Sequence, residues 1–276
     1  MFDSLYQTGR AALITYQVSR KMRLTRNFTA SAILAVCALC AACARAPQTH
    51  SLSIAAAADL QFAMAEASSA FHRSHPEIQV HVSYGSSGNF YAQIRNGAPF
   101  DLFLSADAQY PRSLAKDGLA VGAVFNYAEG RIVVWVPNAS TLDPATALRD
   151  PAVRHLAIAN PAHAPYGRAA EAALRSMGLY DGLQPKLVLS ENISQAFQFV
   201  QSGAADAGIV ALSLASAPAA RSQGRYWEVP AGTYPKMEQC GAILKDSAAA
   251  RQFRDWLTGS AGRALLARYG FSLPGN

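Results

Sequence analysis

The chain has 276 residues, of which 51% are hydrophobic and 15% are charged. These values are typical of a packed globular protein with one large domain or two modest lobes, and they exclude a disordered chain. The net charge of +6 suggests a nucleic-acid binder, but residues 1–42 hold five of the 24 basic and one of the 18 acidic residues. The remainder is nearly neutral and has no basic stripe, so we expect no nucleic-acid partner.

The N-terminal segment has the order of a secretory signal. Basic residues precede the apolar run 28–44, and small residues end it, which predicts a signal peptide over residues 22–46. A permanent membrane anchor is the alternative, although the run is short and rich in alanine for a stable span. Residues 1–21 do not fit the pattern and are expected to be a start-site extension before Met22. We therefore expect an exported, periplasmic protein.

The cysteines agree with this interpretation. Cys37, Cys40 and Cys43 lie in or beside the signal, and only Cys240 lies deep in the mature chain. A single thiol forms no internal disulfide, so the fold must be stabilised by its core. Cys43 resembles a lipoprotein acceptor site, except that Cys40 occupies a position that is normally aliphatic. Plain release is expected, with a lipid anchor at Cys43 as the alternative.

From residue 51 onward, short apolar strands alternate with segments of helical periodicity. The expected strands are 52–56, 80–84, 102–104, 132–136, 156–159, 186–189 and 207–212. The expected helices are 60–71, 90–95, 169–177, 194–200, 247–257 and 262–269. This alternation predicts an α/β protein with parallel sheets covered on both faces. No flexible linker interrupts residues 51–276, so any division into two lobes must come from the chain crossing between sheets.

Four loops lead from an expected strand into an expected helix. Helix N-termini carry unpaired N–H groups and a partial positive charge, so they bind anions without lysine or arginine. The candidate residues in these loops are Ala58, Asp59, Ser86, Ser87, Tyr166 and Ile193. The alternatives are structural: the two serines as plain helix caps, the tyrosine as a surface or interface residue, and the isoleucine side chain as core, with only its N–H free to bind.

Enzyme and metal motifs fail when they are tested. The segment 85–89 lacks the final glycine of a nucleophile elbow, and the chain has no P-loop or dinucleotide fingerprint. His72 and His75 lack a zinc motif and are interpreted as polar helix-end residues. His163 lies in a candidate loop, but no nucleophile can be assigned to it. We expect no enzyme and no direct protein–metal ligands; a secreted serine hydrolase that uses Ser86 or Ser87 is the alternative class.

Five segments in register resemble the periplasmic molybdate-binding proteins of ABC importers, over nearly all of residues 52–275. They are 55–60, 84–88, 96–107, 160–167 and 203–211. The resemblance implies a type II periplasmic binding protein: an α/β fold of two lobes, each a sheet flanked by helices, with a ligand cleft between them. It implies that residues 51–130 plus 235–276 form one lobe and residues 131–234 the other.

The same resemblance implies the ligand and the partner. The protein would capture molybdate or tungstate with neutral donors and deliver it to the membrane permease of an ABC importer, as a monomer without a cofactor. The implied oxyanion ligands are Ala58, Asp59, Ser86, Ser87, Tyr166 and Ile193. Another oxyanion such as sulfate is the alternative within this class.

Two positions depart from the family pattern. The first loop usually places a hydroxyl or amide against the ligand, whereas this chain has Ala58 and Asp59. A carboxylate would repel a dianion, so we expect Asp59 to turn its side chain away and cap the helix, leaving a backbone N–H to bind. Ala211 replaces the tyrosine that another branch of the family uses, which is consistent with Tyr166 supplying the phenol.

Overall fold

The computed structural model describes residues 50–273, and the structural statements below concern this part of the chain. The expected start-site extension, the signal peptide and Cys43 lie outside the described residues. Among the helices that are described, none is both long enough and apolar enough to cross a membrane.

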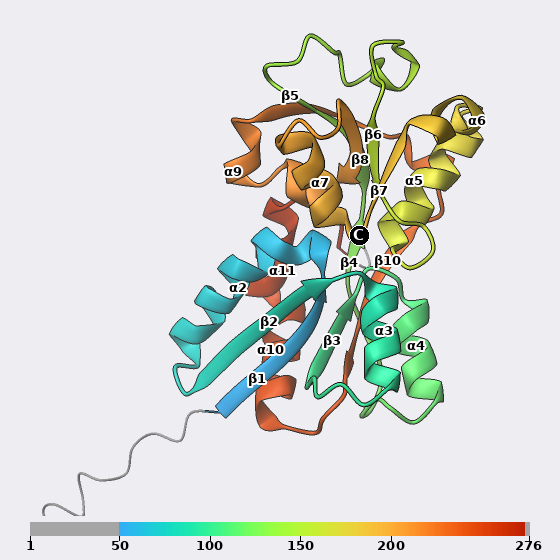
Figure 1. Cartoon of the computed structure of the whole chain (residues 1–276). Helices are drawn as coiled ribbons and strands as arrows, with labels where there is room; N and C mark the ends of the chain where they lie inside the picture. The colour runs from blue at the N-terminus through green and yellow to red at the C-terminus, as the bar shows by residue number, and fades with distance from the viewer. Residues whose placement is uncertain (1–49, 274–276) are drawn as a thin grey trace, which may run out of the picture. The chain divides into compact units, whose positions relative to one another are not determined.

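The first sheet has the strand order β2-β1-β3-β10-β4 (Figure 1). Its strands are β1 (His50–Ala57), β2 (Ile78–Gly85), β3 (Leu102–Ser105), β4 (Phe125–Gly130) and β10 (Met237–Ile243). The helices around it are α2 (Gln61–Ser74), α3 (Ser87–Arg95), α4 (Gln109–Lys116), α10 (Ala248–Thr258) and α11 (Ser260–Arg268), with the short η1 (Ala58–Leu60) before α2. We call this part lobe 1.

The second sheet has the strand order β7-β6-β8-β5-β9. Its strands are β5 (Ile132–Pro137), β6 (Leu156–Ala159), β7 (Leu187–Ser190), β8 (Ala207–Ala211) and β9 (Gly224–Glu228). The helices around it are α5 (Pro165–Ser176), α6 (Tyr180–Leu183), α7 (Ile193–Gln201), α8 (Leu212–Ala215) and α9 (Pro218–Arg221), with the 3-10 turns η2 (Ala147–Arg149), η3 (Gln184–Lys186) and η4 (Ala231–Thr233). We call this part lobe 2.

The chain passes between the sheets twice. It leaves the first sheet after β4 and enters the second at β5, and it returns between β9 and β10. The α/β class with helix-flanked sheets is confirmed, but the expectation of parallel sheets holds only in part: β1 pairs parallel with β2 and β3, and β6 pairs parallel with β7 and β8. β10 pairs antiparallel with β3 and β4, and β5 pairs antiparallel with β8 and β9. The chain keeps its direction when it crosses, so β5 and β10 begin beside the carboxyl ends of β8 and β4: Ile132 pairs with Ala211, and Met237 pairs with Gly130. Each therefore runs opposite to the strand that ends there, which makes both sheets mixed.

The side chains of β1 divide between the two faces of the first sheet. Leu52 and Ile54 are fully buried in a cluster that also holds Phe71 of α2 and Phe253 of α10. These two aromatic rings meet edge to face, with centroids 5.0 Å apart. Ala55 points the other way, into a smaller cluster beneath α3 and α4. Each fully buried large side chain contributes roughly 1.5–3 kcal/mol, so both faces hold β1, and the loop that follows it, in a fixed position.

Cys240 lies on β10 with no exposed surface, and it is a free thiol. Burial raises the pKa of this thiol to about 11, so it remains neutral at physiological pH. We expect Cys240→Ala to lower the free energy of unfolding by about 1–2 kcal/mol, because only one buried sulfur is lost. Urea unfolding of both proteins measures the difference, and failure of the variant to fold would contradict this expectation.

Candidate functional site

One small cavity lies where the loops after β1, β2, β6 and β7 meet. Its volume is about 10 Å³, close to the space for one water-sized group and far below that of a pocket for a drug-sized ligand. It is lined by Ala57, Ala58, Asp59, Gly85, Ser86, Ser87, Ala106, Ala164, Pro165, Tyr166 and Ile193. All six residues expected to bind the ligand are in this lining, which contains no lysine, arginine or histidine. Their role as ligands remains a prediction.

Helix N-termini from both lobes provide donors to this cavity. Ser86 is the N-cap of α3 and accepts from Asn89 N at 3.3 Å, and Asn192 is the N-cap of α7 and accepts from Gln195 N at 3.1 Å. Each cap satisfies an N–H of the third helical position. The N–H groups of the first position, Ser87 and Ile193, therefore have no partner within their helices. They are the donors that an anion would meet.

The two serines have different roles. Ser86 Oγ donates to the backbone oxygen of His163 at 2.9 Å, so it joins lobe 1 to lobe 2. Ser87 is 1% exposed, and its Oγ accepts from Ala106 N at 3.0 Å. Within the described part of the chain, no acceptor is assigned to the hydroxyl hydrogen of Ser87. Ser87 is therefore the side-chain donor that is best placed to bind a ligand, whereas the hydroxyl hydrogen of Ser86 is already engaged.

The position of the Asp59 side chain contradicts the prediction that this side chain caps a helix. Its carboxyl caps no helix, since neither η1 nor α2 has a side-chain cap. Instead Asp59 Oδ2 accepts from Tyr166 Oη at 2.9 Å and from Gln239 Nε2 at 2.6 Å. A buried carboxyl requires hydrogen-bond donors, and here α5 and β10 supply them. Gln239 was not found by the sequence analysis, because its strand was not predicted.

The surroundings of Asp59 shift two pKa values. Burial raises the pKa of Asp59 to about 6, and the hydrogen bonds from Gln239 and Tyr166 offset only part of this effect. Burial, together with the charge on Asp59, raises the pKa of Tyr166 well above its usual range. The phenol is therefore neutral, and its one hydrogen is directed at Asp59 in this structure. For Tyr166 to donate to a ligand, Asp59 must first release that hydrogen.

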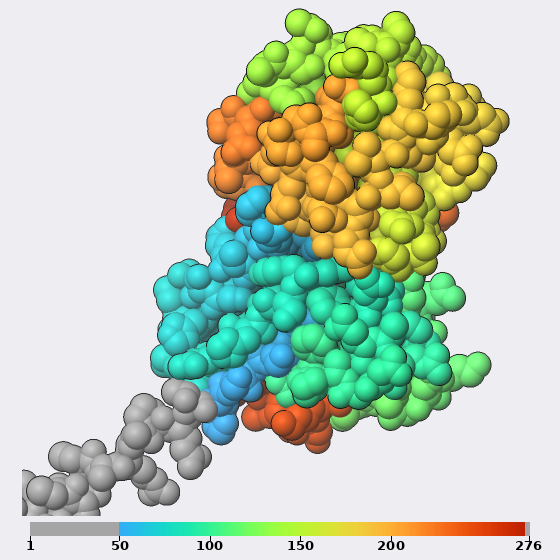
Figure 2. Space-filling model, in the orientation of Figure 1, coloured from blue at the N-terminus to red at the C-terminus, as the bar shows by residue number. Residues whose placement is uncertain are grey.

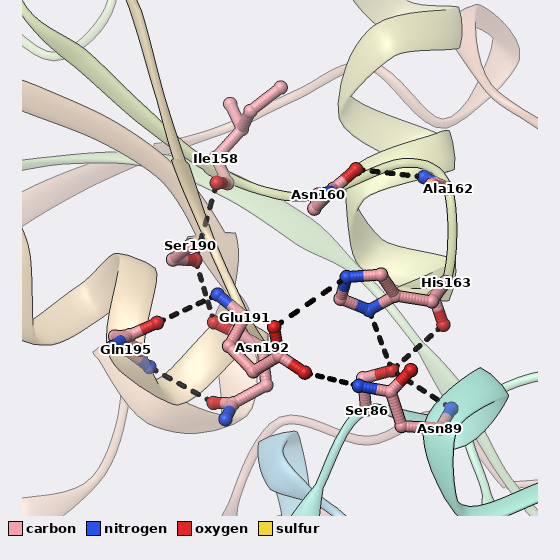
Figure 3. A network of polar contacts seen from close by, with 10 residues as sticks. All are labelled: Ser86, Asn89, Ile158, Asn160, Ala162, His163, Ser190, Glu191, Asn192 and Gln195. Atoms are coloured by element: carbon pink, nitrogen blue, oxygen red, sulfur yellow. Dashed lines mark hydrogen bonds and ion pairs between the residues drawn. The ribbon is translucent and has the colours of Figure 1, made fainter.

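A network of polar contacts closes the two lobes on each other beside the cavity (Figure 3). His163 Nδ1 lies 3.0 Å from Ser86 Oγ, and its Nε2 lies 3.7 Å from Glu191 Oε2. Glu191 also accepts from the side chain of Asn89, and Gly88 N donates to the backbone oxygen of His163 at 3.0 Å. In Figure 2 the gold surface of α7 rests on the blue-green surface of lobe 1 without an open groove on this face. The structure is thus a closed form.

The histidines of α2 take no part in this site. His75 is the C-cap of α2 and stacks on Phe71, with ring centroids 4.2 Å apart, and His72 Nδ1 contacts the backbone oxygen of Ile78. This placement confirms their interpretation as polar helix-end residues. Among residues 50–273, no three His, Cys, Asp or Glu side chains lie together in a way that could hold a metal ion.

Two helix-flanked sheets, joined by two crossings and closed over a small polar cavity, define a two-lobed solute-binding protein. A family model described as bacterial extracellular solute-binding protein matches residues 52–272, and the chain belongs to this family. It is 39% identical over 233 residues to the molybdate-binding protein ModA of Azotobacter vinelandii, covering 83% of this chain and 92% of the relative. It is 38% identical to ModA of Rhodobacter capsulatus, covering 70% of this chain and 77% of the relative.

A solved structure supports the same assignment. The periplasmic molybdate-binding protein of Azotobacter vinelandii superposes with a TM-score of 0.76 at 36% identity, covering 81% of this chain and 99% of that one. The type II periplasmic binding protein fold predicted from the sequence is confirmed.

Proposed function

We propose that this chain is the exported binding component of an ABC importer, and that it captures molybdate or tungstate in the cavity between its lobes. The observation that supports it most directly is the convergence of Ala58, Asp59, Ser86, Ser87, Tyr166 and Ile193 on one closed cavity. Relatives at 38–39% identity that carry the name molybdate-binding protein support the choice of ligand. In this proposal the protein is a periplasmic monomer without a cofactor, and its partner is the membrane permease.

The chemistry of the lining suits a fully ionised oxyanion. N–H and O–H groups donate to the anion's oxygens, and a site built from such donors has few acceptors for a proton carried by the ligand. The cavity is too small for an organic ligand of ordinary size. We further propose that residues 51–130 plus 235–276 and residues 131–234 move as the two lobes, because the chain crosses between the sheets near Arg131 and Tyr234.

Calorimetric titration of the mature protein with molybdate, tungstate, sulfate and phosphate tests this function. Tight binding of molybdate and tungstate, with weak or no binding of the other two, is expected. Preferential binding of sulfate would show that the assigned ligand is wrong, whereas the class of protein would still be supported. If no anion binds, the proposal fails.

Ser87→Ala is expected to weaken molybdate binding by about 1–2 kcal/mol, or roughly five- to thirtyfold. The variant removes one donor to the anion and leaves the net charge unchanged. Ser202→Ala is the matched control, because Ser202 is exposed at the end of α7 that faces away from the cavity. Calorimetry measures both affinities, and equal binding by the two variants would remove Ser87 from the site.

A second candidate is a serine hydrolase, because the structure places His163 Nδ1 3.0 Å from Ser86 Oγ, a contact the sequence did not reveal. Several features oppose it. Ser86 Oγ donates to a backbone oxygen and caps α3, and the His163–Glu191 distance of 3.7 Å is long for an orienting hydrogen bond. The cavity leaves no room for a leaving group. An assay with generic esters is expected to show no turnover, and turnover that Ser86→Ala abolishes would reverse this conclusion.

A further inference from the structure

Asp59 is the one acidic residue in the lining of the cavity, and it is 1% exposed. Among the described residues that line the cavity there is no lysine, arginine or histidine to neutralise it. An ionised Asp59 would therefore confront an incoming dianion directly in a medium of low dielectric constant, where like charges repel strongly. The proposed function requires that this repulsion be removed when the anion binds.

The hydrogen bonds given to Asp59 by other side chains reach only one of its two carboxyl oxygens. Its Oδ2 accepts two hydrogens, from Tyr166 and Gln239, and Gln239 Nε2 also lies 3.1 Å from Tyr166 Oη. Two buried acceptors of this trio, Asp59 Oδ1 and Gln239 Oε1, have no hydrogen-bond partner among the residues that the structure describes. Buried polar atoms without partners are rare and unfavourable. A proton on the carboxyl would turn Oδ1 from an unpaired acceptor into a donor.

The ionisable groups around Asp59 do not compete for this proton. Burial raises the pKa values of Tyr127, Tyr166 and Tyr234, so these phenols remain neutral, and it raises the pKa of Cys240 to about 11. In contrast, burial raises the pKa of Asp59 only to about 6. A nearby dianion would raise it further, because the ionised carboxylate would then face a like charge. Asp59 is thus the group of this cluster that changes charge near neutral pH.

The remaining elements packed against η1 add no compensating charge. These are α2, α7, α8 and β2. The sequences of α7 and α8 contain no ionisable side chain. Glu66 of α2 is bound by Arg268 and Tyr269. The other ionisable residues of α2, His72 and Arg73, are exposed in its last turn, away from η1. The ionisable residues of β2, His81 and Tyr84, are also exposed. His163 reaches the edge of the cavity through Ser86 and is also an ionisable residue, so an experiment must separate it from Asp59.

We infer that Asp59 binds as a neutral carboxylic acid: it takes up one proton from water with each tetrahedral dianion and donates a hydrogen bond to it. This inference rests on the proposed function. The proton is carried on Oδ1, while Oδ2 keeps its donors Tyr166 and Gln239. A carboxylic acid held neutral by its surroundings is an effective donor to an anionic group. Capture of the dianion then adds a net charge of −1 to the protein instead of −2.

Calorimetry of the full mature protein with molybdate tests this inference. Titrations in buffers of different ionisation enthalpy give the number of protons taken up on binding. About one proton is expected near pH 7.5, and the number should fall toward zero below about pH 6, where the free protein already carries it. Above pH 6, the affinity for molybdate should fall about tenfold for each pH unit. Zero proton uptake with a pH-independent affinity would overturn the inference and leave the proposed function standing.

Two variants identify the residue that takes up the proton. Asp59→Asn keeps a neutral donor at this position, so it should bind molybdate without proton uptake and with little dependence on pH. His163→Gln removes the other candidate and should retain the proton uptake of the wild type. Uptake that persists in the first variant or disappears in the second would overturn the assignment. If the wild type binds no oxyanion at any pH, the proposed function fails and the inference fails with it; the wild-type titrations give this answer even if a variant does not fold.

Discussion

Replacing Gly88 with alanine is expected to weaken oxyanion binding by about 3 kcal/mol, or roughly a hundredfold, while the protein still folds. A Cβ atom at Gly88 would lie 2.5 Å from the backbone oxygen of His163 and 2.9 Å from Tyr110 Oη. Gly88 is in lobe 1 and His163 is in lobe 2, so this contact exists only when the lobes are closed. A backbone oxygen cannot rotate away as a flexible side chain can, so the lobes themselves must separate.

Separation of the lobes divides the proposed site. Ser87 then moves away from Ile193, and the anion loses donors from one side or meets water instead. The fold of each lobe should not suffer, because alanine is a better helix former than glycine inside α3. The affinity for molybdate, measured by calorimetry, and the radius of gyration at saturating ligand, measured by small-angle scattering, report the two effects separately.

Gly182→Ala is the matched control for this experiment. Gly182 is exposed in α6, and a Cβ atom placed there meets no atom within 4 Å. The Gly182→Ala variant should bind molybdate with the affinity of the wild type. Wild-type affinity in Gly88→Ala as well would show that closure at His163 is not needed for binding.

The loops of the cavity could be predicted because each has a local sequence signal. Ser86 and Asn192 are polar residues placed directly before helical periodicity, and both are N-caps in the structure. The apolar runs that form β1 and β3 are also local signals, and they predict buried strands. Local patterns of this kind need no knowledge of the rest of the chain, and together they located six of the eleven described residues that line the cavity.

The partners of Asp59 could not be predicted in this way. Its contact with Tyr166 spans 107 residues, and its contact with Gln239 spans 180. Gln239 is on β10, whose pairing with β3 and β4 depends on the return of the chain from lobe 2. The strand β4, which leads into the first crossing, also lacks a continuous apolar pattern, since it reads Phe-Asn-Tyr-Ala-Glu-Gly. Without Gln239 and Tyr166 in view, helix capping was the only role that the sequence offered to Asp59.

Asp59→Asn is expected to stabilise the ligand-free protein at alkaline pH, by up to about 3 kcal/mol in the free energy of unfolding. The pKa of this carboxyl is about 6 in the folded protein against a usual value of 3.8, and each unit of difference corresponds to roughly 1.4 kcal/mol. Because the folded pKa is raised, the folded state binds more protons than the unfolded state between these two values. Stability therefore falls as the pH rises from about 4 to about 6 and then remains low.

The sign of this effect separates Asp59 from an ordinary buried ion pair. A carboxylate stabilised by its partners would have a lowered pKa, and its replacement by asparagine would destabilise the protein at neutral pH. Here the charge is the unfavourable form, so removing it should raise the midpoint of urea unfolding at pH 8 and should change little at pH 4. The asparagine keeps an oxygen for Tyr166 and Gln239, so the fold loses no necessary acceptor.

The difference between the unfolding curves of wild type and variant, measured at several pH values, isolates this residue, because all other titrating groups contribute equally to both proteins. Asp181→Asn is the control: Asp181 is exposed in α6, and its replacement should change stability by less than about 0.5 kcal/mol. If the two curves for Asp59 run parallel, folding does not shift its pKa; if the variant is the less stable protein at pH 8, Asp59 is a stabilised carboxylate. It would then have no reason to take up a proton when the anion enters.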